Sequence, residues 1–166
     1  MNDEVSTNKN TNHPGSEHEL LDVFIGKWIT NGHTIPGSDG NAVKIHTSDI
    51  YEWAPGGFFI VHSTYGKIGF QDVGGVEIIG YDKISNKFDS HLFDSQDNIL
   101  ISELTLDNGI WTWTGPTPFQ EPGTMEMHRA TVEFIEDGKI MTAFHEVSED
   151  GENWIPSMDV TLTKIE

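Results

Sequence analysis

The stretch Leu20-Leu-Asp-Val-Phe-Ile-Gly-Lys-Trp28 decides how the rest of the chain is interpreted. Its leucines, phenylalanine and isoleucine share one face of a short helix, and Gly26 is suited to end that helix in a left-handed conformation. Ser16 and Glu19 have the spacing of a capping box at the helix start. Trp28 then begins the first of many short strands, so we expect one short N-terminal helix followed only by β-structure.

Composition limits the classes of protein to which the chain can belong. Its 166 residues suffice for one domain, and its hydrophobic fraction of 36% is enough for a folded core. The formal net charge of −18 repels phosphate backbones and anionic lipids, so neither nucleic acid nor a membrane is an expected partner. There is no cysteine, which excludes disulfides and thiolate sites and fits a reducing compartment. We therefore predict a cytoplasmic protein.

Two regions are expected along the chain. Residues 1–15 are polar, with almost nothing to bury, so we predict a disordered tail. Residues 16–166 form the single folded domain. Within it, turn signals rich in glycine, asparagine and proline recur from Pro36 to Asn153, separated by runs of valine, isoleucine, threonine and aromatic residues. This punctuation predicts roughly ten strands joined by short loops.

The short sequential connections favour an up-and-down arrangement of antiparallel strands. An open sheet of this size would leave long exposed edges, so closure is favoured. We therefore predict an all-β fold, a single closed antiparallel up-and-down β-barrel with a short N-terminal helix. A two-sheet sandwich with Greek-key crossings is the alternative, and it needs longer crossover loops than most of those expected here.

Several motifs resemble those of a known group of barrels. The segment Phe24-Ile-Gly-Lys-Trp28 resembles the Gly-x-Trp opening of calycin barrels, which include lipocalins, fatty-acid-binding proteins and nitrobindins. More closely, residues from about 18 to 166 resemble a bacterial calycin-like family of uncharacterised function, of the type named domain of unknown function 1579. The motifs that carry this resemblance are Trp53-Ala-Pro-Gly-Gly-Phe58, Ile60-Val-His62, Gly80-Tyr-Asp82, Phe93-Asp-Ser95 and Met127-His-Arg129.

The resemblance has consequences for the barrel end and for cofactors. It implies that Trp28 closes one end of the barrel, with Lys164 from the last strand lying on its ring. Haem binding of the nitrobindin kind needs a histidine near the C-terminus, and none follows His145, so no cofactor is expected. No His-x-His pair suited to a metal ion occurs in the sequence, so no metal is expected.

Arg129 is the only arginine, and it lies in the middle of an expected strand. Facing the interior, its guanidinium would bind a ligand carboxylate or phosphate. Alternatively, an internal ion pair with Asp94 or Glu103 would brace two strands. The sequence leaves both interpretations open.

Other pocket candidates are histidines and aromatic residues. The resemblance places His62 on the third strand and His91 on the fifth, so these two are the strongest histidine candidates. Trp111 and Trp113 share one face of a strand because side chains alternate with a period of two. Packing in the wall is the expected role of any single aromatic residue. The complete set of candidate ligand-binding residues is His62, Tyr81, His91, Phe93, Trp111, Trp113 and Arg129, and no catalytic residue is assigned.

Three function hypotheses follow. The first is a non-enzymatic protein that binds a small, partly apolar molecule in the barrel interior. The second is a small-molecule enzyme that uses His62 or His91 as general base beside Arg129. The third is an interaction module whose acidic face docks a basic partner. The sequence does not predict an oligomeric state.

Overall fold

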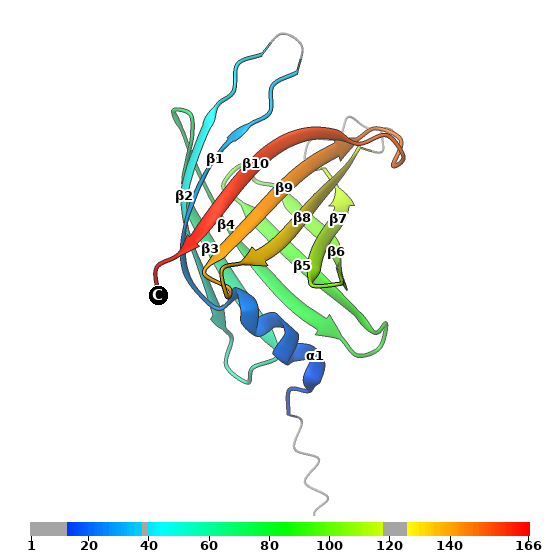
Figure 1. Ribbon diagram of the computed structural model, residues 1–166. Coiled ribbons are helices and arrows are strands. Elements are labelled where there is room, and N and C mark those ends of the chain that lie inside the picture. Colours follow the sequence, from blue (N-terminus) through cyan, green and yellow to red (C-terminus); the bar gives the residue numbers. More distant parts are fainter. Residues whose placement is uncertain (1–12, 38–39, 118–125) are drawn as a thin grey trace, which may run out of the picture.

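The computed structural model describes residues 13–37, 40–117 and 126–166 (Figure 1). Most of the expected tail therefore lies outside the described residues, and the disorder of residues 1–15 stays a prediction. The described chain begins with helix α1 (Ser16–Glu19) and the 3-10 helix η1 (Leu20–Phe24). The strands that follow are β1 (Gly26–Thr34), β2 (Lys44–Trp53), β3 (Phe59–Ile68), β4 (Gln71–Asp82), β5 (Lys87–Asp94), β6 (Ile99–Asp107), β7 (Ile110–Pro116), β8 (Met127–Ile135), β9 (Ile140–Ser148) and β10 (Ile155–Lys164).

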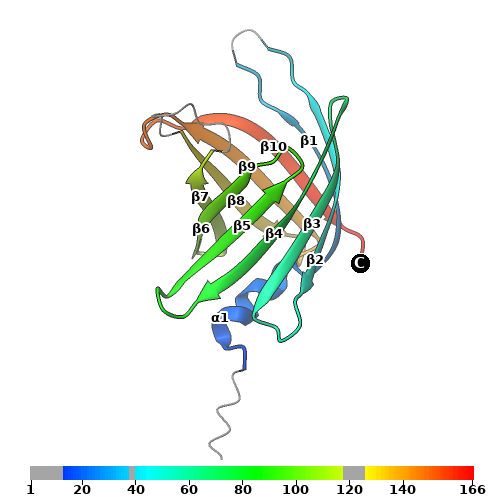
Figure 2. The same cartoon turned by 180° about the vertical axis from the view of Figure 1, so that it is seen from behind.

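These strands form one closed antiparallel barrel. Each strand pairs with its neighbours in sequence, and β1 also pairs with β10, so the sheet has no free edge (Figures 1 and 2). The predicted up-and-down barrel is confirmed, and the sandwich alternative is wrong. None of the helices in the described residues is long and apolar enough to cross a membrane.

The first and last strands meet at a seam. Across it, Lys27 N–H donates to the Glu166 carbonyl at 3.0 Å, and Ile165 N–H donates to the Lys27 carbonyl at 2.8 Å. The Lys27 ammonium also pairs with the Glu166 carboxylate at 2.5 Å. A side chain at Gly26, whose φ is +138°, would collide with the Glu166 carbonyl. Glycine is therefore required where the seam begins.

The helix begins one residue earlier than predicted. Gly15 is the N-cap, and its N–H donates to Nδ1 of His18 at 2.9 Å. His18 thus occupies the position expected for Glu19, and the Ser16 hydroxyl contacts Glu17 instead of capping. The predicted capping box was wrong because the sequence pattern favours serine as the cap, whereas the chain already turns at Gly15.

Trp28 closes the barrel end beside the helix. Its side chain is fully buried, its indole N–H donates to the Phe24 carbonyl at 2.8 Å, and the Lys164 ammonium lies 5.1 Å from its ring centroid. The expected cation–π contact with the last strand is therefore present. The plug that the sequence predicts is confirmed.

A cluster of aromatic rings fills the half of the barrel next to the helix. Phe24 lies at its centre, with ring centroids 5.0 Å from Phe134, 5.5 Å from Trp111 and 5.6 Å from Trp113. Leu21, like Phe24, is almost completely buried and seals the same end. We call this packing the aromatic plug. It occupies only the half of the barrel interior next to the helix, and the opposite half is built differently.

Candidate functional site

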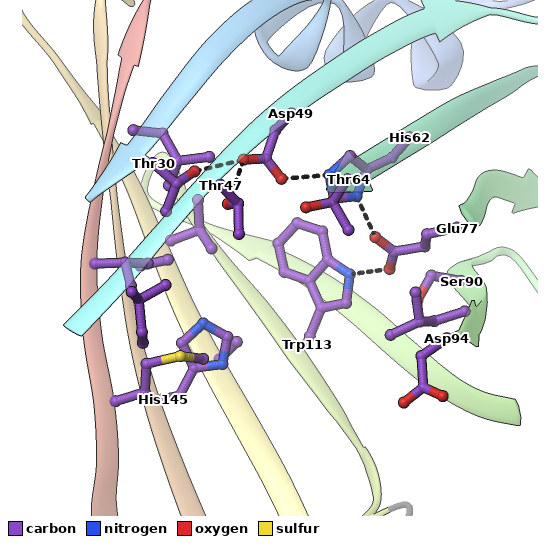
Figure 3. Close-up of a pocket in the computed structure, with 18 of the residues that line it drawn as sticks. Thr30, Thr47, Asp49, His62, Thr64, Glu77, Ser90, Asp94, Trp113 and His145 are labelled. Carbon is purple, nitrogen blue, oxygen red and sulfur yellow. Dashed lines mark hydrogen bonds and ion pairs between the residues drawn. The ribbon is translucent and has the colours of Figure 1, made fainter. Parts of the chain in front are cut away.

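Beyond the aromatic plug the barrel encloses a cavity of about 380 Å³. All ten strands contribute inward-facing side chains to its wall, and Phe24 and Trp113 form part of its floor. A volume of this size falls in the range of small-molecule sites in proteins. The wall is mostly apolar, and its most deeply placed charged side chains come from the neighbouring strands β2, β3 and β4 (Figure 3).

His62 lies on the inner face of β3, between two carboxylates from the neighbouring strands. Its Nε2 is 3.0 Å from Asp49 Oδ1 on β2, and its Nδ1 is 2.9 Å from Glu77 Oε2 on β4 (Figure 3). Burial lowers the pKa of the ring, but the hydrogen bonds and charges of the two carboxylates outweigh burial and raise the pKa of His62 to about 9. The ring is therefore a charged imidazolium at neutral pH.

The two carboxylates are ionised in the same arrangement. Burial works to raise the pKa of Asp49 and of Glu77, yet the charged His62 ring lowers both below their ordinary values. The three side chains, named here the Asp49–His62–Glu77 array, thus carry two negative charges and one positive charge. Their side chains are only 7%, 13% and 12% exposed for Asp49, Glu77 and His62, so these charges act in a poorly screened environment.

Hydroxyl groups, an indole and an aromatic ring hold the array in place. Asp49 Oδ2 accepts hydrogen bonds from the hydroxyls of Thr30 at 2.5 Å and Thr47 at 2.9 Å. Glu77 Oε1 accepts from the Trp113 indole N–H at 3.2 Å. Tyr51 stacks on the His62 ring, with the centroids 3.9 Å apart and the planes 5° from parallel. The array is therefore rigid and internally satisfied.

Two further histidines line the cavity, and both are neutral. His128 donates from Nδ1 to the Pro116 carbonyl at 3.0 Å, so its Nε2 accepts from the Ser102 hydroxyl at 3.2 Å. Burial lowers the pKa of His128. Burial, together with the nearby His128, lowers the pKa of His145 to about 4. Both rings are therefore uncharged, and the N–H group and the lone pair of His128 are already in use.

His145 differs from the other two histidines in having no wall partner. Among the described residues, no side chain or backbone group hydrogen-bonds its ring. The ring projects from β9 into the cavity (Figure 3). His145 is only partly buried, and its ring nitrogens are open to the cavity, where a ligand atom can contact them.

The structure places four of the seven predicted residues inside the barrel or at its end. His62 and Trp113 line the cavity. Trp111 is buried in the aromatic plug, where its ring centroid lies 5.1 Å from that of Phe88. Tyr81 lies near the helix, with its ring 5.0 Å from Phe88 and its hydroxyl donating to Asn86. Neither Trp111 nor Tyr81 lines the cavity.

His91 and Phe93 lie on the outer face of the barrel, so neither of them lines the interior cavity. On β5 the residues that line the cavity are Ser90, Leu92 and Asp94, and the alternation of the strand turns His91 and Phe93 outward. There they line, together with Tyr81, a second pocket of about 500 Å³ on the outer surface. Phe93, like His91, therefore belongs to the solvent side of this strand.

Arg129 also lies on the outer face, between the inward-facing His128 and Ala130. Its Nε and Nη2 donate to Glu146 Oε2 on β9 at 2.9 and 2.6 Å, and its guanidinium lies 4.2 Å from the centroid of the Trp154 ring. An ion pair that braces two strands is therefore present. The expected internal location and the expected partners were wrong, and no role as an interior ligand anchor is left for Arg129.

The ionisable residues of the cavity that were not predicted as site residues include Asp49, Glu77, Asp94, His128 and His145. The sequence contains 27 acidic residues, so nothing in composition distinguishes the two buried carboxylates. A usable signal was the register, because Asp49, His62 and Glu77 each share a strand face with hydrophobic residues. Within residues 13–37, 40–117 and 126–166, no three histidine, aspartate or glutamate side chains are arranged to hold a metal ion.

The fold and the site together define a closed ten-stranded antiparallel barrel with a ligand-sized interior cavity. The chain belongs to the family described as Protein of unknown function (DUF1579), whose model matches residues 13–164. This confirms the family that the motifs predicted. The wider relationship to calycins stays a prediction.

One solved structure illustrates the fold. The crystal structure of Rv2717c from M. tuberculosis is similar with a TM-score of 0.61 and 8% sequence identity, over 92% of this chain and 99% of that one. At this identity the likeness shows the fold alone. No curated protein matches the chain significantly.

Proposed function

We propose that this protein binds one small, partly apolar molecule in the barrel cavity and does not transform it. The observation that carries the proposal is the cavity of about 380 Å³, whose apolar wall is interrupted on one side by a fixed polar array. Apolar pockets with a few well-placed polar groups are typical of small-molecule sites. The apolar wall supplies affinity, and the polar groups supply orientation.

The apolar part of the wall comes from most of the strands, including those that carry the array. Small residues such as Ala130 and Ala143 leave space on β8 and β9, because larger side chains at these positions would fill the interior. Moving apolar ligand surface out of water into this space is favourable by about 25 cal/mol for each Å² buried. The apolar wall residues are Ile45, Ile68, Val73, Leu92, Leu100, Ala130, Val132, Met141, Ala143, Met158, Val160 and Leu162.

The geometry gives little support to the enzyme that pairs His62 or His91 with Arg129. Both ring nitrogens of His62 are hydrogen-bonded to carboxylates, so the ring has no free lone pair with which to accept a proton. His91 and Arg129 face away from the cavity. The catalytic alternative now depends on His145, whose neutral ring has free nitrogens and a pKa of about 4.

The remaining proposals concern the cellular location of the protein and its binding partners. The absence of cysteine supports a reducing compartment, and we propose the cytoplasm. The net charge of −18 supports solubility and also leaves room for docking to a basic protein. Docking to a basic partner is compatible with ligand binding, because the first uses the outer surface and the second uses the interior.

Titration with the uncharged fluorescent probe N-phenyl-1-naphthylamine tests the binding function. We expect fluorescence to rise to saturation at one probe per chain, because the cavity provides one apolar site. The variant Ala143→Phe places a ring in the cavity and should abolish the rise. Thr142→Phe is the matched control, because Thr142 is adjacent on β9 and faces outward; it should bind the probe as the wild type does.

Two results would contradict the proposal. One is saturable binding of the probe that Ala143→Phe leaves unchanged, which would place the binding site outside the barrel. The other is the absence of any probe binding by a folded wild-type protein. Native mass spectrometry of protein purified from its source adds an independent measurement, because a natural ligand retained in the cavity appears as added mass.

A further inference from the structure

The charged side chains that line the cavity are mostly negative. Asp49, Glu77 and Asp94 are carboxylates, His62 is the one charged histidine, and no lysine or arginine is among the described residues of the wall. Hydrogen bonds from Asn98 and from the backbone N–H of Gln96 outweigh burial and lower the pKa of Asp94, so this carboxylate is ionised as well. Three carboxylates and one imidazolium leave the cavity wall with a net negative charge.

This charge acts on a ligand more strongly than the charge of the outer surface does. The side chains of Asp49 and Glu77 are almost buried, and the fields of buried groups are poorly screened by salt. A carboxylate or phosphate that enters the cavity meets repulsion from the wall and finds no guanidinium or ammonium to neutralise it. An uncharged ligand group is not repelled by the negative wall, and a cation is attracted by it.

The hydrogen-bonding capacity of the array is already in use. Asp49 accepts from Thr30, Thr47 and His62, and Glu77 accepts from His62 and Trp113. These carboxylates therefore make the electrostatic potential in the cavity negative. Because their oxygens already accept hydrogen bonds from the protein, they are not free to bind a ligand. The His145 ring projects into the same cavity, and among the described residues it has no partner. It is therefore available to donate to a ligand group or to accept from one.

We propose that the cavity selects neutral or positively charged, partly apolar molecules with one hydrogen-bonding group that contacts His145, and that it rejects carboxylates and phosphates. This selectivity rests on the proposed binding function. An interior arginine would confer the opposite preference, because its guanidinium binds carboxylates and phosphates. Alcohols, amides, neutral heterocycles and amines are the classes of ligand that fit.

A set of ligands with the same chain and different head groups tests this selectivity. Displacement of N-phenyl-1-naphthylamine is measured for 1-decanol, decylamine and decanoate at neutral pH and physiological ionic strength. We expect decanol and decylamine to bind at least about tenfold more tightly than decanoate, because only decanoate brings a negative charge into the negative cavity. Ala143→Phe identifies any binding to the outer surface, since that binding survives the blocked cavity.

The outcomes of this experiment distinguish the proposed ligand selectivity from the proposed binding function. Decanoate binding as tightly as decanol overturns the selectivity and leaves the binding function standing. Binding of the probe with no displacement by any decyl compound also overturns the selectivity. Failure of the probe and of all three compounds to bind a folded protein overturns the binding function itself.

Charge variants separate the cavity field from the charge of the whole protein. Asp94→Asn keeps an oxygen for the backbone N–H groups of Gln96 and Asn98, so the turn is retained, and it removes one charge from the cavity wall. We expect it to reduce the preference for decanol over decanoate by about threefold. Glu133→Gln removes one charge from the exposed outer face of β8 and should leave the preference unchanged. Equal effects of the two substitutions would overturn the role of the cavity wall.

A third variant tests the role of His145. His145→Phe keeps a ring of similar size and removes both nitrogens. We expect the affinity for decanol to fall by about fivefold, the loss typical of one neutral hydrogen bond. The affinity for the probe should change less, because its binding is dominated by apolar contact. Unchanged or tighter decanol binding would remove His145 from the site.

Discussion

The two halves of this barrel are built on the same strands and have opposite interiors. Next to the helix, Phe24 packs against Trp111 and Phe134, Phe134 packs against Trp28, and the two tryptophans and Phe24 are buried. In the other half, small residues such as Ala130 and Ala143 occupy inward positions, and a cavity remains. The difference teaches that side-chain volume at a few inward positions, and not the course of the backbone, divides the interior into a core and a binding site.

The halves also differ in how their polar groups are handled. The filled half contains few polar side chains, and these have local partners such as the Phe24 carbonyl that accepts from Trp28. The open half holds two buried carboxylates and a charged imidazole. We therefore expect the stability of the protein to depend mainly on the filled half and its ligand preference to depend on the open half.

The largest effect is expected for Trp28→Ala, which removes the side chain that closes the barrel end in the filled half. The change should lower the free energy of unfolding by about 3–5 kcal/mol, as truncation of a large buried aromatic side chain does. Urea unfolding followed by circular dichroism measures it. Trp154→Ala is the control, because Trp154 contacts Arg129 on the outer face, and it should cost about 1 kcal/mol. A cost below about 1 kcal/mol for Trp28→Ala would mean that the plug does not hold the barrel together.

The second prediction concerns the charged array in the open half. The pKa of His62 is raised from 6.5 to about 9 on folding, so the folded protein holds this proton more tightly than the unfolded chain does. The resulting stability is complete below pH 6.5 and is lost as the pH rises through 9. Its size is on the order of 3 kcal/mol. Urea unfolding at several pH values in this window should show the decline, and His62→Gln should remove it.

Other groups of the cavity do not obscure this decline. The pKa of His145 is lowered to about 4, so its contribution is lost as the pH falls below 6.5, outside the window. Asp49 and Glu77 have lowered pKa values, so they too lose their contribution on the acid side. A wild-type stability that stays flat from neutral pH to pH 9 would show that His62 is not charged in the folded protein.

A matched pair on β6 compares the two halves directly. Leu104 packs in the filled half, whereas Leu100 lines the cavity on the same strand. We expect Leu104→Ala to cost about 3 kcal/mol and Leu100→Ala about 1 kcal/mol, because a side chain beside empty space loses fewer contacts when it is removed. Equal costs in chemical unfolding would show that the cavity wall is packed as tightly as the plug.

A small effect on stability, similar to that of Leu100→Ala, is expected for Arg129→Met, outside both halves. The Arg129–Glu146 pair and the contact with Trp154 lie on the outer face, where the Arg129 side chain is 32% exposed. Partly exposed ion pairs contribute little, so we expect a cost of about 1 kcal/mol and unchanged binding of the cavity probe. Loss of probe binding without loss of stability would return Arg129 to the ligand site.

The two halves of the barrel also differ in how well the sequence predicts them. In the filled half the role of Trp28 was predicted, because the Gly-x-Trp pattern and the hydrophobic run before it are strong local signals, but Trp111 and Tyr81 were assigned to the ligand site and do not line the cavity. The face assignments failed in the strands that border the cavity. On β5 the inward positions are Ser90, Leu92 and Asp94, and two of these three are polar, so hydrophobicity does not indicate which side faces inward.

The polar site was beyond prediction for a related reason. Asp49, His62 and Glu77 come from three strands, and only the register brings them into contact. The single predicted member, His62, was chosen by resemblance, and its carboxylate partners were hidden among many acids. For Arg129 the sequence indicated correctly that its charge needs a partner, but it did not indicate the face on which that partner lies.

The seam between β1 and β10 has a consequence for how the protein is made. On the ribosome the N-terminal strands emerge first, yet β1 lacks one of its partners until residues up to Glu166 have been released. Until then the nascent chain is an open sheet with unpaired edges on β1 and β9, and such edges invite association with other chains. The cavity therefore does not exist during synthesis. A ligand can be captured only after β10 has emerged and paired with β1, and a chain that stops before β10 yields an unclosed sheet.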